Sequence, residues 1–451
     1  MNINKIFRAY DVRGIYPDHL NKEFAYKLGN AFVLFLKKEF NKDKNITIVI
    51  GQDGRESSLP LFHSFARGVL NQGANIIDIG LAATDSLYFA LNFLKTTAGV
   101  IITGSHNPKN YNGFKLATKG PKFLSGQWGL PELEKICQKD FSSFSNKADI
   151  KKYNILPDYK KHILSLIKID KLKPKNIIVD ASGGVAAKMI NFTKDKIPGN
   201  LDCIYCEIDS NFSNHSPNPV IPGNLSDLSN KVKTKGADFG LAFDGDGDRT
   251  VFVDEKGNLI KADMILALFA KHFLKKQPGS SIVYNLTCSR SVPEVIKENN
   301  GKPIKNRTGS TFMKMISKKY QAILGGEISG HFCYKDNFFG ESGILTLLIM
   351  QEILSQNNSP LSQLIKPLKR YYRINETNFR VKNRKKTIKL LSDYYKNGKK
   401  DWLDGLSVEF DNWWFNARPS NTEPLLRLVI EANKKSLAEN KLQEIKRIIN
   451  K

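Results

Sequence analysis

Ser105 occupies the position in this sequence that is best suited to making and breaking a covalent bond. It follows residues 98–102 (AGVII), an apolar run typical of a buried strand. The chain then turns through residues 103–108 (TGSHNP), where small polar side chains and a proline end the strand. The end of a rigid strand is a common place for a reactive hydroxyl, although an ordinary Ser/Asn/Pro turn has the same composition.

Three carboxylates, Asp244, Asp246 and Asp248, alternate with glycine directly after a second apolar run. Such a cluster can surround one hard cation with oxygen ligands. An EF-hand loop is the nearest rival, because Glu255 stands at its twelfth position. Its sixth position needs glycine but holds Arg249, and the preceding residues are typical of a strand rather than a helix. The spacing therefore favours a magnesium site of another kind, in which a phosphate oxygen completes the ligands.

Two later polar loops have the composition of binding sites for a phosphorylated sugar. Glu327, Ser329 and His331 offer a carboxylate, a hydroxyl and an imidazole on a glycine-flexed turn. These groups suit sugar hydroxyls, although a loop histidine that only satisfies a neighbour is equally compatible with the sequence. Residues 418–424 (RPSNTEP) combine a guanidinium with hydroxyls and an amide, which are the donors that a phosphate accepts. A proline-rich turn before a strand is the structural alternative for this loop.

The predicted elements place these loops at the ends of strands. In the first part of the chain, the runs 46–50, 75–79 and 98–103 predict buried strands, and residues 51–55 (GQDGR) predict a turn. Asn21 is expected to cap a helix with an apolar face, formed by Phe24, Leu28, Phe32 and Phe35. This alternation indicates a doubly wound α/β unit with functional loops at the carboxyl ends of its strands. Similar units begin at 177–180 and 281–284, and a terminal amphipathic helix ends the last segment.

Taken with residues 7–14 (FRAYDVRG), these loops resemble the motifs of the phosphohexomutase family, specifically its phosphomannomutase/phosphoglucomutase branch. The resemblance runs almost from end to end, and the four motifs occur in the family's order. It implies an α/β fold of four domains around a central cleft: three related mixed α/β sandwich domains and a smaller α+β C-terminal domain. The expected boundaries, with the serine, metal, sugar and phosphate loops in that order, are 1–150, 151–255, 256–366 and 367–451.

The resemblance also implies a reaction and a role for each loop. The reaction interconverts hexose 1-phosphate and hexose 6-phosphate, of mannose or glucose, through a phosphoserine enzyme and a hexose 1,6-bisphosphate that also activates it. Ser105 would carry the phosphoryl group and join the three aspartates as a ligand of Mg²⁺. Arg13 and Arg249 would stabilise charge, and Lys115 would shuttle a proton. The sugar would be bound by Glu327, Ser329 and His331, and the non-reacting phosphate by Arg418, Ser420, Asn421 and Thr422.

One difference from the family's motifs and two alternative enzyme functions bear on this interpretation. Phosphoglucosamine mutase usually has glycine where this chain has Asn421 and glutamine where it has Ile328, and both differences favour an unsubstituted hexose. Many phosphomannomutases carry Thr-Gly-His where this chain has Thr308-Gly309-Ser310. The hydroxyl of Ser310 cannot supply a proton or a positive charge at neutral pH. A serine hydrolase centred on Ser105 is disfavoured, because adjacent serine and histidine rarely meet and Asn107 breaks the G-x-S-x-G pattern.

Composition limits the remaining alternatives. The net charge of +25, from 69 Lys and Arg against 44 Asp and Glu, raises the possibility of a nucleic-acid-binding protein. The excess is spread along the chain without a nucleic-acid-binding motif, which favours a solvated basic surface that attracts phosphorylated substrates. No apolar run approaches the length of a membrane span, and the first residues have no apolar signal region. We expect a cytoplasmic monomer or weak dimer that binds a small phosphosugar and neither nucleic acid nor membrane.

The five cysteines, an odd number, argue against a disulfide framework. Cys203 and Cys206 form a C-x-x-C pair, but residues 201–206 predict a strand that would direct the two thiols to opposite faces. No second pair lies at zinc spacing. The sequence therefore predicts neither a disulfide nor a metal site at these cysteines.

Overall fold

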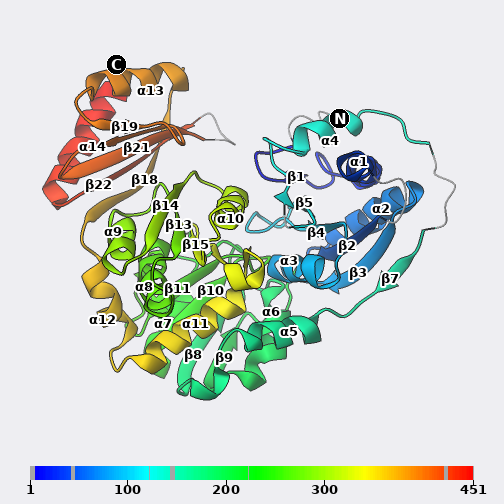
Figure 1. Ribbon diagram of the computed structural model, residues 1–451, viewed down its shortest axis with the longest axis horizontal. Coiled ribbons are helices and arrows are strands. Elements are labelled where there is room, and N and C mark those ends of the chain that lie inside the picture. Colours follow the sequence, from blue (N-terminus) through cyan, green and yellow to red (C-terminus); the bar gives the residue numbers. More distant parts are fainter. Residues whose placement is uncertain are drawn as a thin grey trace.

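The protein folds into four units, each built on its own sheet. The computed structural model describes residues 6–41, 46–120, 122–142, 148–221, 223–420 and 425–449. Figure 1 shows the first and last units at opposite upper corners of the molecule and the two middle units joining them below. The four-domain α/β architecture that the sequence predicted is confirmed. Within the described ranges, no helix combines the length and the apolar character needed to cross a membrane.

The first unit is a seven-stranded sheet covered by four helices. The strands, in spatial order, are β1 (Val12–Ile15), β5 (Tyr111–Thr118), β4 (Ala98–Ile102), β2 (Thr47–Gln52), β3 (Asn75–Leu81) and β7 (Ile150–Lys152), with β6 (Lys122–Phe123) paired to β5. The helices are α1 (Lys22–Phe40), α2 (Ser58–Asn71), α3 (Thr84–Phe93) and α4 (Leu130–Ile136). Asn21 caps α1 as predicted, since its side-chain oxygen accepts the N–H of Phe24 at 2.9 Å.

The second and third units are five-stranded sheets with helices. The second has β12 (Leu259–Ile260), β11 (Thr250–Asp254), β10 (Phe239–Phe243), β8 (Lys175–Asp180) and β9 (Gly199–Ile204), with α5 (Leu156–Ser165), α6 (Ala186–Thr193) and α7 (Ser226–Lys235). The third has β14 (Lys302–Asn306), β13 (Ser281–Asn285), β15 (Leu324–Gly326), β16 (Phe332–Tyr334) and β17 (Gly340–Glu341). Its sequence region also holds α8 (Ala262–Lys276), α9 (Ser291–Glu298), α10 (Ser310–Lys319), α11 (Gly343–Gln356) and α12 (Leu361–Ile365).

One four-stranded pattern recurs in these three sheets. It is β5-β4-β2-β3 in the first, β11-β10-β8-β9 in the second and β16-β15-β13-β14 in the third. In each, the first strand is antiparallel to the second, and the remaining neighbours are parallel. Ser105, the aspartate cluster and Glu327 each lie in the turn from the second strand of the pattern back to the first. The three loops are therefore equivalent points of a repeated fold, although the sequence shows no close repeat.

The C-terminal unit is an antiparallel sheet with two helices. Its strand order is β18 (Tyr372–Arg380), β22 (Leu425–Ala432), β21 (Trp413–Pro419), β20 (Leu406–Glu409) and β19 (Lys399–Asp401). Its helices are α13 (Arg384–Tyr394) and α14 (Lys435–Ile449). It has a hydrophobic core of its own, whereas one continuous core joins the other three units. The predicted phosphate loop connects β21 to β22, and its Asn421 and Thr422 lie outside the described residues.

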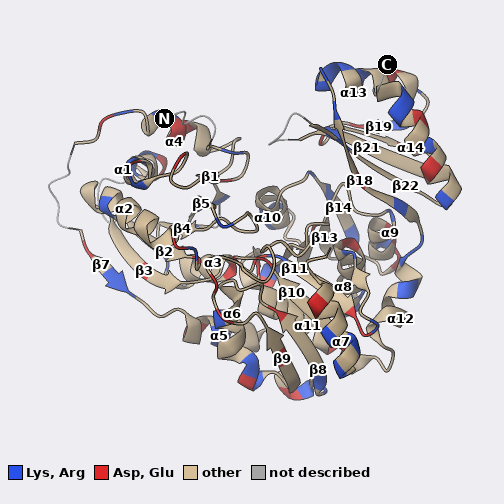
Figure 2. Cartoon of the chain, turned by 180° about the vertical axis from the view of Figure 1, so that it is seen from behind, with Lys and Arg blue, Asp and Glu red and all other residues tan. Residues whose placement is uncertain are grey.

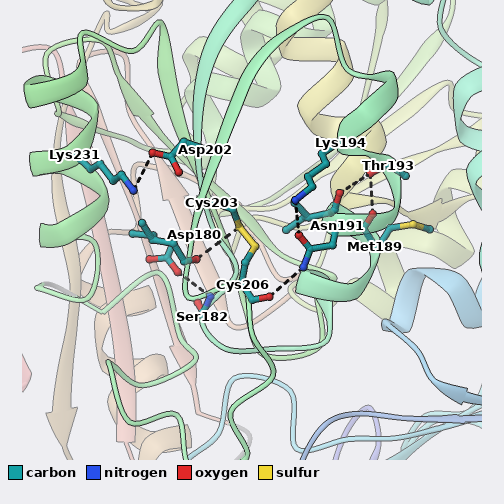
Figure 3. The surroundings of a disulfide bond; sticks show 12 residues. Asp180, Ser182, Met189, Asn191, Thr193, Lys194, Asp202, Cys203, Cys206 and Lys231 are labelled. Carbon is teal, nitrogen blue, oxygen red and sulfur yellow. Dashed lines mark hydrogen bonds and ion pairs between the residues drawn. A yellow bond between two sulfur atoms is a disulfide. The ribbon is translucent and has the colours of Figure 1, made fainter.

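The prediction that Cys203 and Cys206 form no disulfide is wrong. β9 ends at Ile204, and Tyr205 adopts a left-handed conformation with φ of 53°, so the alternation of a strand does not extend to Cys206. The turn brings the two Cα atoms to 5.8 Å, and the cysteines form a disulfide (Figure 3). A short strand followed by a turn therefore allows a bond that a longer strand would have prevented.

Asp85 provides a test of how the first three units are held together. It lies buried in α3, where it accepts the N–H of Gly343 at the start of α11 at 3.3 Å and interacts with Tyr159 of α5. Burial raises the pKa of Asp85 from 3.8 to about 7. Between these two pH values the folded protein holds a proton that the unfolded chain releases, so stability falls as pH rises.

We expect Asp85→Asn to remove this pH dependence. Urea unfolding between pH 5 and pH 8 should show the wild type losing about 2–3 kcal/mol relative to the variant. The control is Asp170→Asn, at an exposed aspartate, which should keep the wild-type slope. An Asp85→Asn variant that keeps the wild-type loss of stability between pH 5 and pH 8 would contradict the prediction.

Candidate active site

The functional loops of all four units line one cleft of about 580 Å³. This volume is within the range of small-molecule sites. Of the residues selected from the sequence, those that line it are Arg13, Ser105, Lys115, Asp248, Arg249, Glu327, Ser329, His331, Arg418 and Ser420. Asp244 and Asp246 are fully buried, and they contact the lining residues Ser105 and Lys115 respectively. The structure thus brings together all of the selected residues that it describes.

Ser105 is presented by a tight turn beside the carboxylates. Its φ of 49° lies in the left-handed region, and its side chain is almost wholly buried. Its Oγ donates to Asp244 Oδ2 at 3.2 Å, which connects the first unit to the second. It also lies 3.2 Å from His106 Nδ1, so the expectation that these neighbours do not meet is wrong. The left-handed turn at Ser105 accompanies this contact. Burial, together with Arg249 and Arg13, lowers the pKa of His106 well below its usual value, so its imidazole is neutral at neutral pH.

The three aspartates form a compact buried cluster that fits a hard cation. One carboxylate oxygen from each lies within 4.8 Å of the others. Burial raises the pKa of Asp244 well above its usual value, and the negative charges of Asp246 and Asp248 add to this effect. Oδ1 of Asp246 is buried without a hydrogen-bond partner in the described part of the chain. A bound cation would use that oxygen and relieve the repulsion, so the donor set suits an oxygen-coordinated metal.

Lys115 lies between two of these carboxylates. Its Nζ is 2.5 Å from Oδ2 of both Asp246 and Asp248. Burial alone would lower the pKa of Lys115, but the carboxylates outweigh it and hold the pKa above its usual value. In this arrangement Lys115 is an ammonium ion that neutralises the cluster. A metal ion bound to the same oxygens would compete with it.

Arg13 and Arg249 place positive charge beside the Ser105 turn. Arg13 donates to Asn107 Oδ1 at 2.6 Å and forms an ion pair with Asp11 at 2.5 Å. Arg249 lies 3.7 Å from Asp244 Oδ2, and its backbone N–H donates to the other oxygen of that carboxylate at 3.1 Å. Burial is the largest cause of the lowered pKa of His106, and both arginines lower that pKa further. The surroundings of Ser105 are therefore suited to an anion.

The loop at Glu327 is held in place from several sides. Oε1 of Glu327 accepts the N–H of Gly309 at 2.7 Å and the side chain of Asn285 at 3.1 Å. Ser329 donates to Oε2 at 3.2 Å. His331 is 2.9 Å from the Ser329 hydroxyl and 3.2 Å from Asp248, so it connects the sugar loop to the acidic cluster. Fixed acceptors and donors of this kind can select the orientation of sugar hydroxyls.

The C-terminal unit contributes a pair of arginines to the cleft, one of which the sequence interpretation missed. Arg418 of β21 pairs in register with Arg427 of β22, so two positive charges stand directly opposite each other. Glu376 binds both, at 2.7 Å to Arg418 and 3.2 Å to Arg427. Like charges directly opposite each other are unfavourable, and the carboxylate of Glu376 offsets this repulsion. The signal in the sequence was the symmetric placing of two arginines about one hairpin turn.

Comparisons with known proteins agree with this arrangement. The four phosphoglucomutase/phosphomannomutase domain families match in order: α/β/α domain I at residues 4–140, domain II at 157–257, domain III at 261–371 and the C-terminal domain at 376–448. A phosphomannomutase of Vibrio cholerae is 37% identical over 99% of this chain and 98% of its own length. A phosphomannomutase/phosphoglucomutase of Pseudomonas aeruginosa is 35% identical over 98% and 94%.

A solved structure gives the same result for the fold. The phosphoglucomutase/phosphomannomutase family protein of Burkholderia thailandensis superposes with a TM-score of 0.90 at 30% identity, over 99% of this chain and 97% of that one. The acidic cluster, the serine turn and the paired arginines all lie within the matched domains. The chain belongs to the phosphoglucomutase/phosphomannomutase family of mutase enzymes.

Proposed function

We propose that the protein interconverts hexose 1-phosphate and hexose 6-phosphate, with mannose or glucose as the sugar. The observation that carries this proposal is that one cleft holds a serine beside an acidic cluster and, on another unit, a pair of arginines. Such a cleft has one place to transfer a phosphoryl group and another to hold one. The names of the relatives support the choice of mannose and glucose phosphates.

In the proposed reaction, phosphorylated Ser105 gives its group to O6 of a hexose 1-phosphate. The bond from phosphorus to Ser105 Oγ breaks as the bond from phosphorus to O6 forms, and the proton of O6 passes to the enzyme. The resulting hexose 1,6-bisphosphate turns over, and its C1 phosphoryl group returns to Ser105 Oγ. In this second transfer the bond from phosphorus to O1 breaks as the bond to Oγ forms, and the proton of Oγ passes through the enzyme to O1. Proteins promote such transfers mainly by positioning and by neutralising charge.

Each part of the cleft has a place in this scheme. Asp244, Asp246, Asp248 and Ser105 would hold Mg²⁺, which supplies charge neutralisation at the phosphoryl oxygens. Arg13 and Arg249 stabilise negative charge beside Ser105. Lys115, which is an ammonium ion, gives its proton to the leaving oxygen and takes one back from the attacking hydroxyl. Glu327 and Ser329, with His331, bind two ring hydroxyls. Arg418, Ser420, Asn421 and Thr422 hold the phosphate that is not reacting, together with Arg427.

The surface charge, cellular location, oligomeric state and partners of the enzyme are part of the same proposal. Figure 2 shows Lys and Arg on β7, α7 and α13, which belong to three different units, rather than on one arm. A positive field of this kind raises the local concentration of anionic sugar phosphates. We propose a cytoplasmic enzyme that works as a monomer or weak dimer on a small phosphosugar, with no nucleic-acid partner.

A coupled assay tests the proposed function. Purified protein is given mannose 1-phosphate, glucose 1-phosphate or glucosamine 1-phosphate, each with a trace of the matching 1,6-bisphosphate and with Mg²⁺ or a chelator. We expect turnover of at least one of the first two sugars, little with the third, and loss of activity with the chelator. Preferred turnover of glucosamine 1-phosphate, or no turnover of any sugar, would refute the proposal.

Arg418→Ala should weaken binding of both substrates alike. The guanidinium contacts the held phosphate in both half-reactions, and loss of a charged hydrogen bond costs about 1.5–3 kcal/mol, or about 10–150-fold in affinity. Steady-state kinetics with glucose and mannose 1-phosphates measure this as a raised KM. Arg447→Ala, at an exposed arginine on α14, is the control and should leave KM unchanged. A defect confined to one sugar would contradict a shared phosphate site.

A further inference from the structure

Arg55 forms the centre of the turn that presents Ser105. Its side chain is 1% exposed, although it lies outside the cleft-lining residues. Nη1 donates to the carbonyl oxygens of Pro108 at 2.7 Å and Tyr111 at 3.1 Å. Nη2 donates to those of Ser105 and Asn107, both at 2.8 Å. Four main-chain carbonyls from one seven-residue stretch thus face one guanidinium.

Asp53 completes this support. Its Oδ2 accepts from Arg55 Nε at 3.0 Å, from Thr103 Oγ1 at 2.8 Å and from the N–H of Gly104 at 3.1 Å. Thr103 Oγ1 in turn accepts the N–H of Ser105 at 2.7 Å. A Cβ on Gly104 would lie 2.5 Å from Arg55 Cζ, so the turn is packed directly against the guanidinium. Asp53 and Arg55 together bind the main chain on both sides of Ser105.

The same support recurs in the repeated fold. Asp53 directly follows β2, and Asp180 and Asn285 are the last residues of the equivalent strands β8 and β13. Each accepts the N–H of the residue two positions later. In the third unit, Asn285 donates to Glu327 of the sugar loop. In the second, Ser182 donates to the carbonyl of Phe243, just before the acidic cluster. In each unit, the turn after this strand holds the neighbouring functional loop.

From this arrangement we infer that Arg55 is a positioning residue for phosphoryl transfer, holding the Ser105 turn in the conformation that reaches the acidic cluster. Ser105 has a φ of 49°, which residues with a Cβ disfavour, so its conformation depends on external hydrogen bonds. A Cβ on Gly245 would lie 2.6 Å from the carbonyl oxygen of Ser105, so the serine turn packs directly against the metal loop. Arg55 binds that same carbonyl and therefore sets how the two loops meet. The inference rests on the proposed function, in which Ser105 carries the phosphoryl group.

Arg55→Ala should lower kcat and leave KM for the hexose 1-phosphates unchanged. The held phosphate and the sugar loop are on other units, whereas a misplacement of about 1 Å at a reacting atom costs about 10²-fold in rate. Added guanidinium ion, at concentrations well below those that unfold the protein, should occupy the vacated space and restore part of kcat. Ethylammonium ion has the same charge but cannot bond four carbonyls in a plane, so it should restore less. Arg67→Ala, at an exposed arginine of α2, is the matched control and should behave as the wild type.

The outcomes separate this inference from a purely structural role. A wild-type kcat in Arg55→Ala, a defect confined to KM, or no response to guanidinium ion in a folded variant would overturn it. If Arg55→Ala does not fold, Arg55→Lys replaces it, and a native near-UV circular dichroism spectrum with lowered kcat and unchanged KM is expected. A wild-type kcat in Arg55→Lys would then overturn the inference. Failure of the proposed function would show separately, as a wild-type protein with neither mutase activity nor phosphate on Ser105.

Discussion

Ser105→Ala is expected to lower kcat by about 10⁴-fold or more, because it removes the group that carries phosphate between the two half-reactions of the proposed mechanism. The Oγ lies 3.2 Å from Asp244, and no other hydroxyl in the described part of the chain is known to contact that carboxylate. Substrate binding should persist, since the sugar loop and the paired arginines are on other units. Ligand-dependent protection against thermal unfolding measures that binding in the inactive variant.

Mass spectrometry gives an independent test of the same residue. Freshly purified wild-type protein should carry one phosphoryl group in part of the sample, and peptide analysis should place it on Ser105. Ser105→Ala should lack it, whereas Ser165→Ala, at an exposed serine of α5, should keep both the phosphate and the activity. Full activity in Ser105→Ala would exclude the phosphoenzyme mechanism.

The positions of the reactive groups could be predicted because strand ends are visible in the sequence. An apolar run followed by small polar residues gave the end of β4 and the turn with Ser105, and the same pattern gave the acidic cluster after β10. The periodic apolar face of α1 and its cap at Asn21 are also local features. Local patterns therefore identified the functional loops one by one.

The supporting residues could not be predicted in this way, because their partners are distant or lie on the main chain. The sequence shows residues 51–55 only as a turn, whereas Arg55 bonds carbonyls that lie 50 to 56 positions later. Arg427 comes to lie opposite Arg418 only through the register of β21 and β22. Cys203 and Cys206 form a bond because β9 ends two residues before the second cysteine. Each depends on where the backbone turns rather than on the composition of the stretch.

Lys115→Ala should lower kcat by 10²–10⁴-fold, the usual effect of losing a general acid or base. The ammonium lies 2.5 Å from Asp246 and from Asp248, within the cleft and next to the serine turn. Removing it also removes a competitor for the metal, so the Mg²⁺ concentration needed for half-maximal activity should not rise. A variant whose activity returned fully at high Mg²⁺ would show that Lys115 supports the metal rather than the proton transfer.

Ser310→Ala is the comparison that makes this test specific. Ser310 begins α10 and lines the cleft where many phosphomannomutases have histidine, but its hydroxyl provides neither a proton nor a charge at neutral pH. We therefore expect only a modest loss of turnover, within about 10-fold, because a neutral hydrogen bond contributes about 0.5–1.5 kcal/mol. Both variants are measured at saturating substrate and Mg²⁺, so that binding defects do not enter kcat. If Ser310→Ala were as impaired as Lys115→Ala, the proton transfer would have to be assigned to the 308–310 loop instead, with His331 as the next residue to test.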